Sequence, residues 1–130
     1  MVCLDTDILI DFLRNDNYTL KKISEFKKNN IELATTTINT FELFKGAFRL
    51  KQKDAFDGLT GLLNNLKIFD FNFKASEKAA QILEKLRLNG ETIDALDLMI
   101  ASIAIINNEL FLTRNIKHFS KISELKIKEM

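Results

Sequence analysis

The sequence contains no proline, no tryptophan, four glycines, one cysteine and one histidine. The lone Cys3 cannot form an internal disulfide bond, and no Cys or His residues have the spacing of a zinc site. The glycines form neither a GxGxxG turn nor a Walker-type loop, which argues against dinucleotide and P-loop nucleotide sites. A nucleophilic triad would depend wholly on His118, and no serine stands in a nucleophile-elbow setting. These absences exclude thiolate zinc centres and disfavour nucleotide-binding folds and hydrolase triads.

An excess charge of one sign and long apolar runs are also lacking. The chain has 19 Lys and Arg against 18 Asp and Glu, which is too balanced for a domain that holds nucleic acid by bulk charge. The longest strongly apolar run, Leu98 to Ile106, is far shorter than the roughly 20 residues that cross a bilayer. Asp5, Asp7 and Asp11 are incompatible with an N-terminal signal peptide. We therefore expect a soluble, cytoplasmic protein without membrane contact, and the single cysteine fits a reducing compartment.

Apolar material is plentiful, with 46% hydrophobic residues and 11 Phe among 130 residues. This length predicts a single domain over residues 1–130 with one hydrophobic core. Short apolar runs predict strands at residues 2–4, 31–36, 67–71 and 109–113, and a possible edge strand at 125–128. Apolar residues at helical spacing predict helices at about 8–13, 20–29, 37–48, 52–66, 75–88, 94–107 and 116–122. Such alternation implies an α/β fold with a mainly parallel sheet covered by helices on both faces.

Polar residues after the predicted strands form a candidate site, because sites in open α/β sheets lie beyond the carboxyl ends of the strands. Asp5 ends the first strand, and Thr113 and Asn115 follow the fourth. Glu42 lies in the early turns of the helix after the second strand, about 6 to 9 Å along the axis from its start. Asp94 and Asp97 are three residues apart and share a face of a late helix. These side chains can converge on one rim of the sheet.

Several carboxylates packed together repel one another unless a cation lies among them. Oxygen ligands without His or Cys suit Mg²⁺ or Mn²⁺, which keep several waters and use few protein carboxylates. Such an ion can bind a phosphate oxygen and lower the pKa of a bound water. The acidic residues therefore predict phosphodiester hydrolysis without a covalent enzyme intermediate.

Each acid also has a structural interpretation. Asp5 can cap the helix that follows the first strand, and Glu42 can be an ordinary solvated helix residue. Asp94 and Asp97 can form a capping pair. Asp97, however, directly precedes an apolar run, and an acid beside a buried helix needs a partner. Asp7 is expected to face solvent beside Asp5, close enough to affect the site without binding metal.

Basic residues dominate outside the candidate acids. Removing Asp5, Glu42, Asp94 and Asp97 from the 18 acids leaves 14 against 19 basic residues, a remainder of +5. Lys-rich stretches can attract an RNA backbone, whose binding is largely electrostatic, or can be solvated helix faces.

Four segments resemble the PIN-domain family, and most closely its VapC toxins from prokaryotic toxin–antitoxin modules. They occur in family order and span nearly the whole chain: residues 4–7 (LDTD), 40–46 (TFELFKG), 97–102 (DLMIAS) and 112–115 (LTRN) with His118 and Phe119. The resemblance implies a PIN-like three-layer α/β/α sandwich and a metal-dependent endoribonuclease. It also implies that Asp5, Glu42 and Asp97 form the acidic core that binds Mg²⁺ or Mn²⁺.

The resemblance implies further polar residues at the site. Thr6 and Thr113 would support the metal-binding acids. Many family members have a fourth acid where this chain has Asn115, which offers a carbonyl oxygen but no charge. Asp94, one turn before the core Asp97, is expected to supply the missing charge.

VapC toxins cut structured cellular RNA, are inhibited by a VapB antitoxin and commonly form homodimers, so the resemblance implies these partners here. The antitoxin's C-terminal segment lies in a groove near the site. Phe41, Phe44 and Phe48 form an apolar helical stripe that can line such a groove or belong to the core.

Two other functions stay open. A receiver-like signalling module also places acids after strand one, and Asp70 could accept its phosphoryl group. That alternative leaves Glu42 and Asp97 without a role and expects two adjacent acids where Thr6 separates Asp5 from Asp7. A PIN-like domain that only binds RNA or a partner is the other alternative, with Asn115 as a sign of weakened catalysis.

Overall fold

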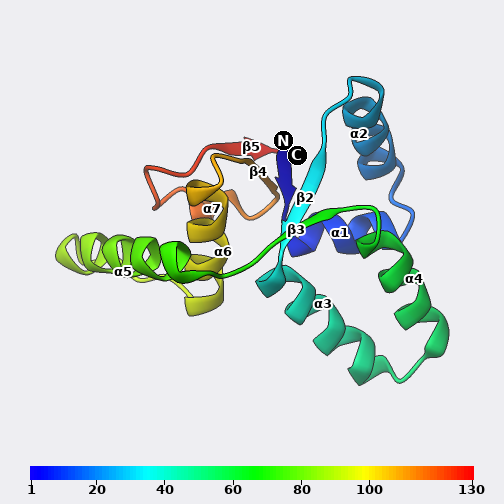
Figure 1. Ribbon diagram of the computed structural model, residues 1–130, viewed down its shortest axis with the longest axis horizontal. Helices are drawn as coiled ribbons and strands as arrows, with labels where there is room; N and C mark the ends of the chain where they lie inside the picture. Colours follow the sequence, from blue (N-terminus) through cyan, green and yellow to red (C-terminus); the bar gives the residue numbers. More distant parts are fainter.

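The computed structural model describes residues 1–130 as a five-stranded sheet with helices on both faces (Figure 1). The strand order is β3-β2-β1-β4-β5, and every neighbouring pair is parallel. The strands are β1 (Val2–Leu4), β2 (Leu33–Thr36), β3 (Lys67–Phe69), β4 (Leu110–Thr113) and β5 (Ile127–Glu129). The helices are α1 (Thr6–Leu13), α2 (Asn17–Lys28), α3 (Thr37–Leu50), α4 (Lys53–Leu63), α5 (Phe73–Leu88), α6 (Ala95–Ile106) and α7 (Ile116–Phe119).

Strand β1 is central, and its side chains alternate between the two faces of the sheet. Val2 and Leu4 belong to one apolar cluster, whereas Cys3 between them belongs to the other. This follows from the two-residue period of a strand. Because parallel strands covered on both faces bury every side chain, β1 needs consecutive apolar residues.

The apolar side chains form two clusters of 12 buried residues each, one on each face, rather than the single core predicted from length. Helices α1 to α4 contribute to the first cluster, and α5 to α7 contribute to the second. Figure 1 shows α5, α6 and α7 on the left of the sheet and α1, α2 and α4 on its right. The predicted three-layer α/β/α sandwich is therefore confirmed, and its sheet is wholly parallel.

The predicted elements are present, and the differences lie at their ends. Strand 31–36 begins at Leu33, and the edge strand predicted at 125–128 lies at Ile127–Glu129. The strand predicted at 67–71 ends at Phe69, because Asn72 turns the chain and caps α5 by accepting from the Ala75 amide at 3.0 Å. The helix predicted at 52–66 ends at Leu63, and that predicted at 116–122 is one turn long.

Helix α6 is apolar on most sides because it lies inside the second cluster. Its residues Leu98 and Ile100 to Ala104 are buried. The Ser102 hydroxyl donates to the Leu98 carbonyl at 2.7 Å, so its polar atom is satisfied within the helix. Neither α6 nor any other helix combines the length and apolarity needed to span a membrane.

Candidate active site

Asp5 lies directly after β1, where the chain passes from the sheet into α1. It is the N-cap of α1, and its Oδ1 accepts from the Thr6 amide at 2.8 Å. The capping interpretation is therefore confirmed, but it accounts for only one of the bonds to this carboxylate. The Thr113 hydroxyl, at the end of β4, donates to Asp5 Oδ2 at 2.7 Å, and the Asn39 amide nitrogen in α3 donates to Oδ1 at 3.1 Å. Three elements thus fix one carboxylate.

The surroundings of Asp5 also disfavour a negative charge on its carboxyl group. Only 7% of the residue is exposed. Burial and the neighbouring charge of Asp7 raise the pKa of Asp5 to about 7, although the hydrogen bonds from Thr113 and Thr6 oppose this shift. The Asp5 carboxylate is held in place but poorly solvated, so a cation bound beside it would stabilise its charged form.

Glu42 reaches the same pocket from α3. Its Oε1 accepts from the Thr6 hydroxyl at 2.9 Å. That hydroxyl in turn accepts from the Asn39 amide nitrogen at 2.8 Å. Glu42 is therefore not a freely solvated helix residue, because a hydrogen-bond chain connects it to the group that holds Asp5.

Asp97, in the first turn of α6, approaches from the other side. Its side chain is 20% exposed, and its Oδ2 lies 3.5 Å from His118 Nδ1. Burial and the nearby charge of Asp94 raise the pKa of Asp97, whereas His118 lowers it. The Asn115 side chain also contacts His118 Nδ1, at 3.0 Å.

Asp94 is the N-cap of α6 and points its carboxylate at the helix backbone. Its Oδ2 accepts from the amides of Leu96 and Asp97, at 3.1 and 3.4 Å. The residue is exposed and does not line the pocket that the other acids share. The capping interpretation is confirmed for Asp94, and its position gives no support to a direct metal contact.

An open, polar pocket of about 400 Å³ brings together most of the predicted site residues. It has one hydrophobic residue in its lining, which consists of Asp5, Thr6, Asp7, Ile10, Glu42, Asp97, Arg114 and Asn115. Thr113 is fully buried and supports Asp5 from below. Asp70, the residue required by the receiver alternative, is exposed beyond the end of β3 and lies outside the pocket.

The structure adds Asp7, which was expected to face solvent. That prediction is wrong, because Asp7 is half-buried, lines the pocket and accepts from the Arg114 amide at 3.0 Å. Burial raises the pKa of Asp7. Its second oxygen, Oδ1, is buried without a hydrogen-bond partner. The sequence did indicate its proximity to Asp5, and the charge of Asp7 raises the pKa of Asp5.

The structure also adds Asn39, a fully buried residue that sequence reasoning missed. It is the third residue of α3, where it completes a capping box with Thr36. An amide at this position, three residues before Glu42, is the signal that could have revealed it.

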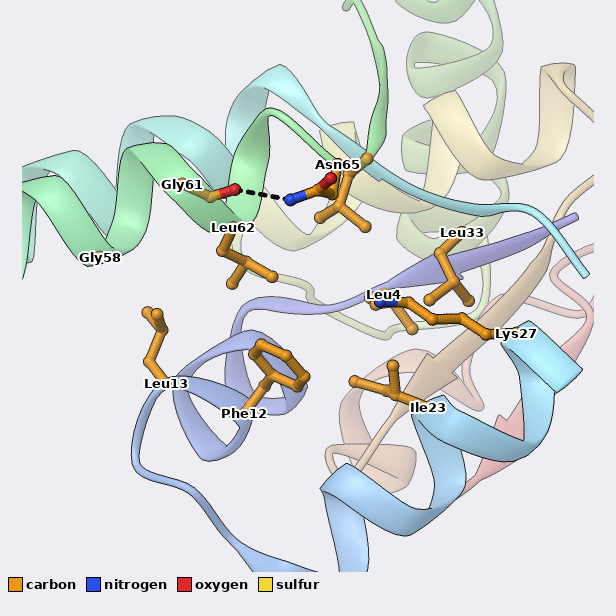
Figure 2. Close-up of a pocket in the computed structure, with 11 residues that line it drawn as sticks. Leu4, Phe12, Leu13, Ile23, Lys27, Leu33, Gly58, Gly61, Leu62 and Asn65 are labelled. Atoms are coloured by element: carbon orange, nitrogen blue, oxygen red, sulfur yellow. Dashed lines mark hydrogen bonds between the residues drawn. The ribbon is translucent and has the colours of Figure 1, made fainter.

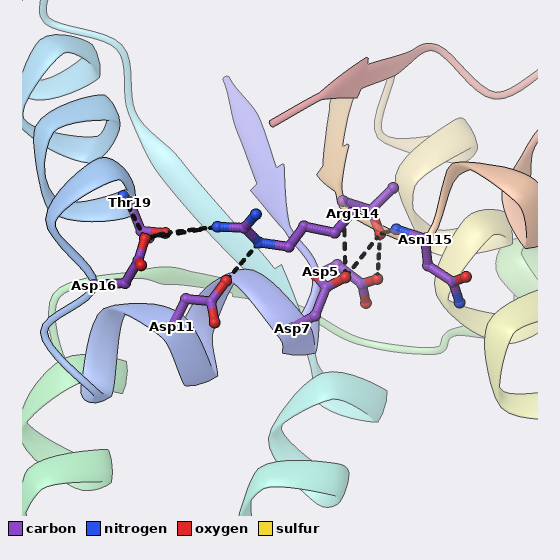
Figure 3. A network of polar contacts seen from close by, with 8 residues as sticks. Asp5, Asp7, Asp11, Asp16, Thr19, Arg114 and Asn115 are labelled. Atoms are coloured by element: carbon purple, nitrogen blue, oxygen red, sulfur yellow. Dashed lines mark hydrogen bonds and ion pairs between the residues drawn. The ribbon is translucent and has the colours of Figure 1, made fainter.

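Arg114 is the one Lys or Arg in the pocket lining, but its guanidinium turns away from Asp5 and Asp7 (Figure 3). It pairs with Asp11 in α1 and lies 3.6 Å from the carboxylate of Asp16, the N-cap of α2. The charge of Asp5 and Asp97 is therefore not neutralised by this arginine.

A second pocket, of about 280 Å³, lies between α1, α2 and α4 and has a different character (Figure 2). Seven of its 11 lining residues are hydrophobic, including Phe12, Leu33 and Leu62. It contains no carboxylate, so it offers none of the chemistry of the acidic pocket.

The acidic pocket meets the requirements of a hard divalent cation in its donor chemistry. All candidate donors are oxygens, Asp7 Oδ1 has no partner, and the pKa values of Asp5, Asp7 and Asp97 are all raised mainly by burial. No three His, Cys, Asp or Glu side chains converge closely enough to form a ready-made metal cluster. A cation shared by these acids therefore requires a side chain to move or a water to bridge the remaining distance.

Comparison with known proteins gives a consistent family. A PIN domain matches residues 2–125. The chain is 32% identical to Ribonuclease VapC2 of Rickettsia felis over 130 residues, covering 94% of this chain and 92% of the relative. It is 31% identical to Ribonuclease VapC3 of Methanocaldococcus jannaschii over 100 residues, covering 77% and 94%. The structure of VapBC2 from Rickettsia felis, bound to a promoter DNA fragment, is similar with a TM-score of 0.92 and 28% identity, covering 100% of this chain and 99% of that chain.

The chain therefore belongs to the PIN-domain family, which its fold and acidic pocket already indicated. Within the family it is similar to the VapC ribonucleases, so the resemblance seen in the four sequence segments is confirmed.

Proposed function

We propose that this protein is a Mg²⁺- or Mn²⁺-dependent endoribonuclease and the toxin of a VapBC-type toxin–antitoxin module. One observation carries the proposal: Asp5, Glu42 and Asp97, from three separate elements, line a single open pocket at the carboxyl edge of a parallel sheet. The similarity to proteins named ribonucleases supports the same chemistry.

Asp5, Glu42 and Asp97 would hold the cation, and Asp7 would adjust the charge of the site. When bound, a divalent ion supplies an activated water and charge stabilisation for phosphodiester hydrolysis. Thr113 keeps Asp5 oriented by donating to its Oδ2, and Thr6 keeps Glu42 oriented by donating to its Oε1. The open shape of the pocket leaves room for a phosphodiester of a folded RNA.

Partners follow from the same comparison. The similarity to VapBC2, a toxin–antitoxin complex, supports a VapB-like antitoxin as inhibitor. A homodimer is expected from family membership, and an enzyme that cuts cellular RNA would act in the cytoplasm.

The two alternatives are less well supported. The receiver alternative requires Asp70, which lies outside the pocket. The alternative of a PIN-like domain that only binds RNA or a partner does not explain why a carboxyl group is buried at position 5, and the named relatives are ribonucleases.

The test is cleavage of a pool of cellular RNA by the purified protein, with Mn²⁺ or with EDTA. We expect cleavage only with the metal, and a loss of at least about 100-fold in Asp5→Asn and in Asp97→Asn, because removing a direct ligand exceeds the 10- to 100-fold cost of removing a supporting group. Asp70→Asn, an exposed acid outside the pocket, is the matched control and should cut like wild type. Equal cutting by wild type and both pocket variants would reject the proposal.

A further inference from the structure

The Asn39 side chain makes contacts that exceed what its helix requires. Its Oδ1 accepts from the Thr36 hydroxyl at 2.7 Å and from the Thr36 amide at 3.3 Å, which completes the capping box of α3. Capping uses only this oxygen. The two protons on its Nδ2 are left to other partners.

Those protons both go to the acidic pocket. Nδ2 donates to Asp5 Oδ1 at 3.1 Å and to Thr6 Oγ1 at 2.8 Å, and Thr6 then donates its own proton to Glu42 Oε1 at 2.9 Å. One amide group thus contacts Asp5 directly and Glu42 through a single hydroxyl. The donors and acceptors match along the whole chain of bonds.

The orientation of the amide is determined by its surroundings. The Thr36 amide is a donor only, so it requires the Asn39 oxygen on its side. A reversed amide would also place an oxygen against the Asp5 carboxylate. Because Asn39 is fully buried, water does not compete for these bonds.

We infer that Asn39 is a positioning residue, which fixes the separation of the Asp5 and Glu42 carboxylates so that both can bind one divalent cation. This inference rests on the proposed function and adds a residue to it. Asn39 touches neither metal nor RNA and acts through Asp5 and through Thr6. Replacing its donors should therefore weaken metal binding and turnover more than it weakens RNA binding.

The decisive variant is Asn39→Asp, because it separates the two roles of the side chain. An aspartate still accepts both bonds from Thr36, so a residue that only caps α3 would tolerate it. It loses both donors and faces Asp5 with an oxygen. We expect at least a tenfold loss of Mn²⁺ affinity, measured by calorimetry on the purified protein, and a similar loss of kcat with KM for RNA changed less than about twofold. Asn72→Asp, at the N-cap of α5, is the matched control and should match wild type.

A second pair of variants covers the case in which the buried charge prevents folding. Asn39→Ala adds no charge and removes both the cap and the donors, whereas Thr36→Ala weakens the cap and leaves the donors in place. Melting temperatures establish that each variant is folded. We expect Asn39→Ala to lose at least tenfold in Mn²⁺ affinity and Thr36→Ala to lose much less. Equal losses, or a folded Asn39→Ala with the affinity of wild type, would overturn the inference.

The connection through Thr6 has its own test. Thr6→Val removes the hydroxyl at nearly constant shape, and Thr6→Ser restores it. Weakened Mn²⁺ binding in Thr6→Val with recovery in Thr6→Ser supports the relay, and equal affinities overturn it. If the wild-type protein neither binds Mn²⁺ nor cuts RNA, the proposed function itself fails, which is distinct from a failure confined to Asn39.

Discussion

The two sides of the acidic pocket are built differently. We call Asp5 and Glu42, with their partners Thr6, Asn39 and Thr113, the inner wall, and Asp97, Asn115 and His118 the outer wall. On the inner wall Asp5 accepts three hydrogen bonds and is 7% exposed. On the outer wall the Asp97 carboxylate has one contact, at 3.5 Å to His118, and its side chain is 20% exposed.

This difference indicates that the inner and outer walls have different roles in one site. The inner wall has its geometry fixed before any ligand arrives, which is how supporting groups raise the precision of a site. The outer wall has fewer fixing contacts, since the Asp97 carboxylate has only the one to His118. Since no three acids converge in the structure as it stands, adjustment of Asp97 is the simplest route to a shared cation.

The largest expected effect is the pH dependence of stability that Asp5 on the inner wall causes. The pKa of Asp5 is about 7 in the folded protein, compared with about 3.9 in an unfolded chain. Between these values the folded state binds more protons, so the free energy of unfolding falls as pH rises, by up to about 1.4 kcal/mol per pH unit. The stability that protonated Asp5 contributes is fully present below pH 4 and is lost as pH rises through 7. Urea titrations in EDTA from pH 4 to pH 8 should show this fall in wild type.

Asp5→Asn is the matched variant for that measurement, because it keeps the shape and removes the titrating group. It should flatten most of the decline and be more stable than wild type at pH 8. The pKa values of Asp7 and Asp97 are also raised, so a smaller slope remains. A variant with the full wild-type slope would show that Asp5 is not the poorly solvated group.

A smaller effect distinguishes the helix-capping role of Asp94 from a role of its charge in metal binding. Asp94→Ala removes the acceptor for the Leu96 and Asp97 amides and should lower the free energy of unfolding by about 1 kcal/mol. Asp94→Asn retains a good N-cap and should keep nearly all of that stability. Because Asp94 lies outside the pocket, we expect both variants to bind Mn²⁺ within about threefold of wild type. A tenfold loss of Mn²⁺ affinity in Asp94→Asn would instead establish a role for its charge.

The smallest expected effect is on Mn²⁺ affinity and comes from residue 115 on the outer wall. Asn115→Asp introduces the fourth acid that many family members have at this position, next to Asp97 in the pocket lining. An added carboxylate should tighten Mn²⁺ binding by about threefold, because affinity for hard cations rises with ligand charge. Calorimetry at fixed ionic strength measures this change, with Asn107→Asp, at the far end of α6, as the control. Unchanged or weaker binding would show that residue 115 does not face the cation.

Much of this protein could be predicted from local patterns. The apolar run at residues 2–4 predicted the central strand, and helical spacing predicted α5 and α6 nearly in full, because burial on a face imposes a regular period. The pocket lining includes Asp5, Glu42 and Asp97, which were selected as residues after predicted strands or on early helical turns. Their role as metal ligands stays a prediction.

Other features of the site depend on contacts that no local pattern contains. Thr113 donates to Asp5 across 108 positions of sequence, and Asn39 does so across 34. These bonds exist because β1 lies between β2 and β4 in a parallel sheet, which brings three strand ends to the same edge. The burial of Asp7 and the exposure of Asp94 follow from the same arrangement, since neighbouring elements decide which oxygens meet solvent.

The sequence by itself determined the α/β class, the order of elements and the family, because these depend on periodicity and on motifs that can be read along the chain. The tertiary structure alone decided which polar groups hold the acids, since a hydrogen bond needs its donor within about 3 Å and only the assembled sheet sets that distance. Asn39 shows the difference: its place in the helix is local, but its two protons find their partners only in the folded protein.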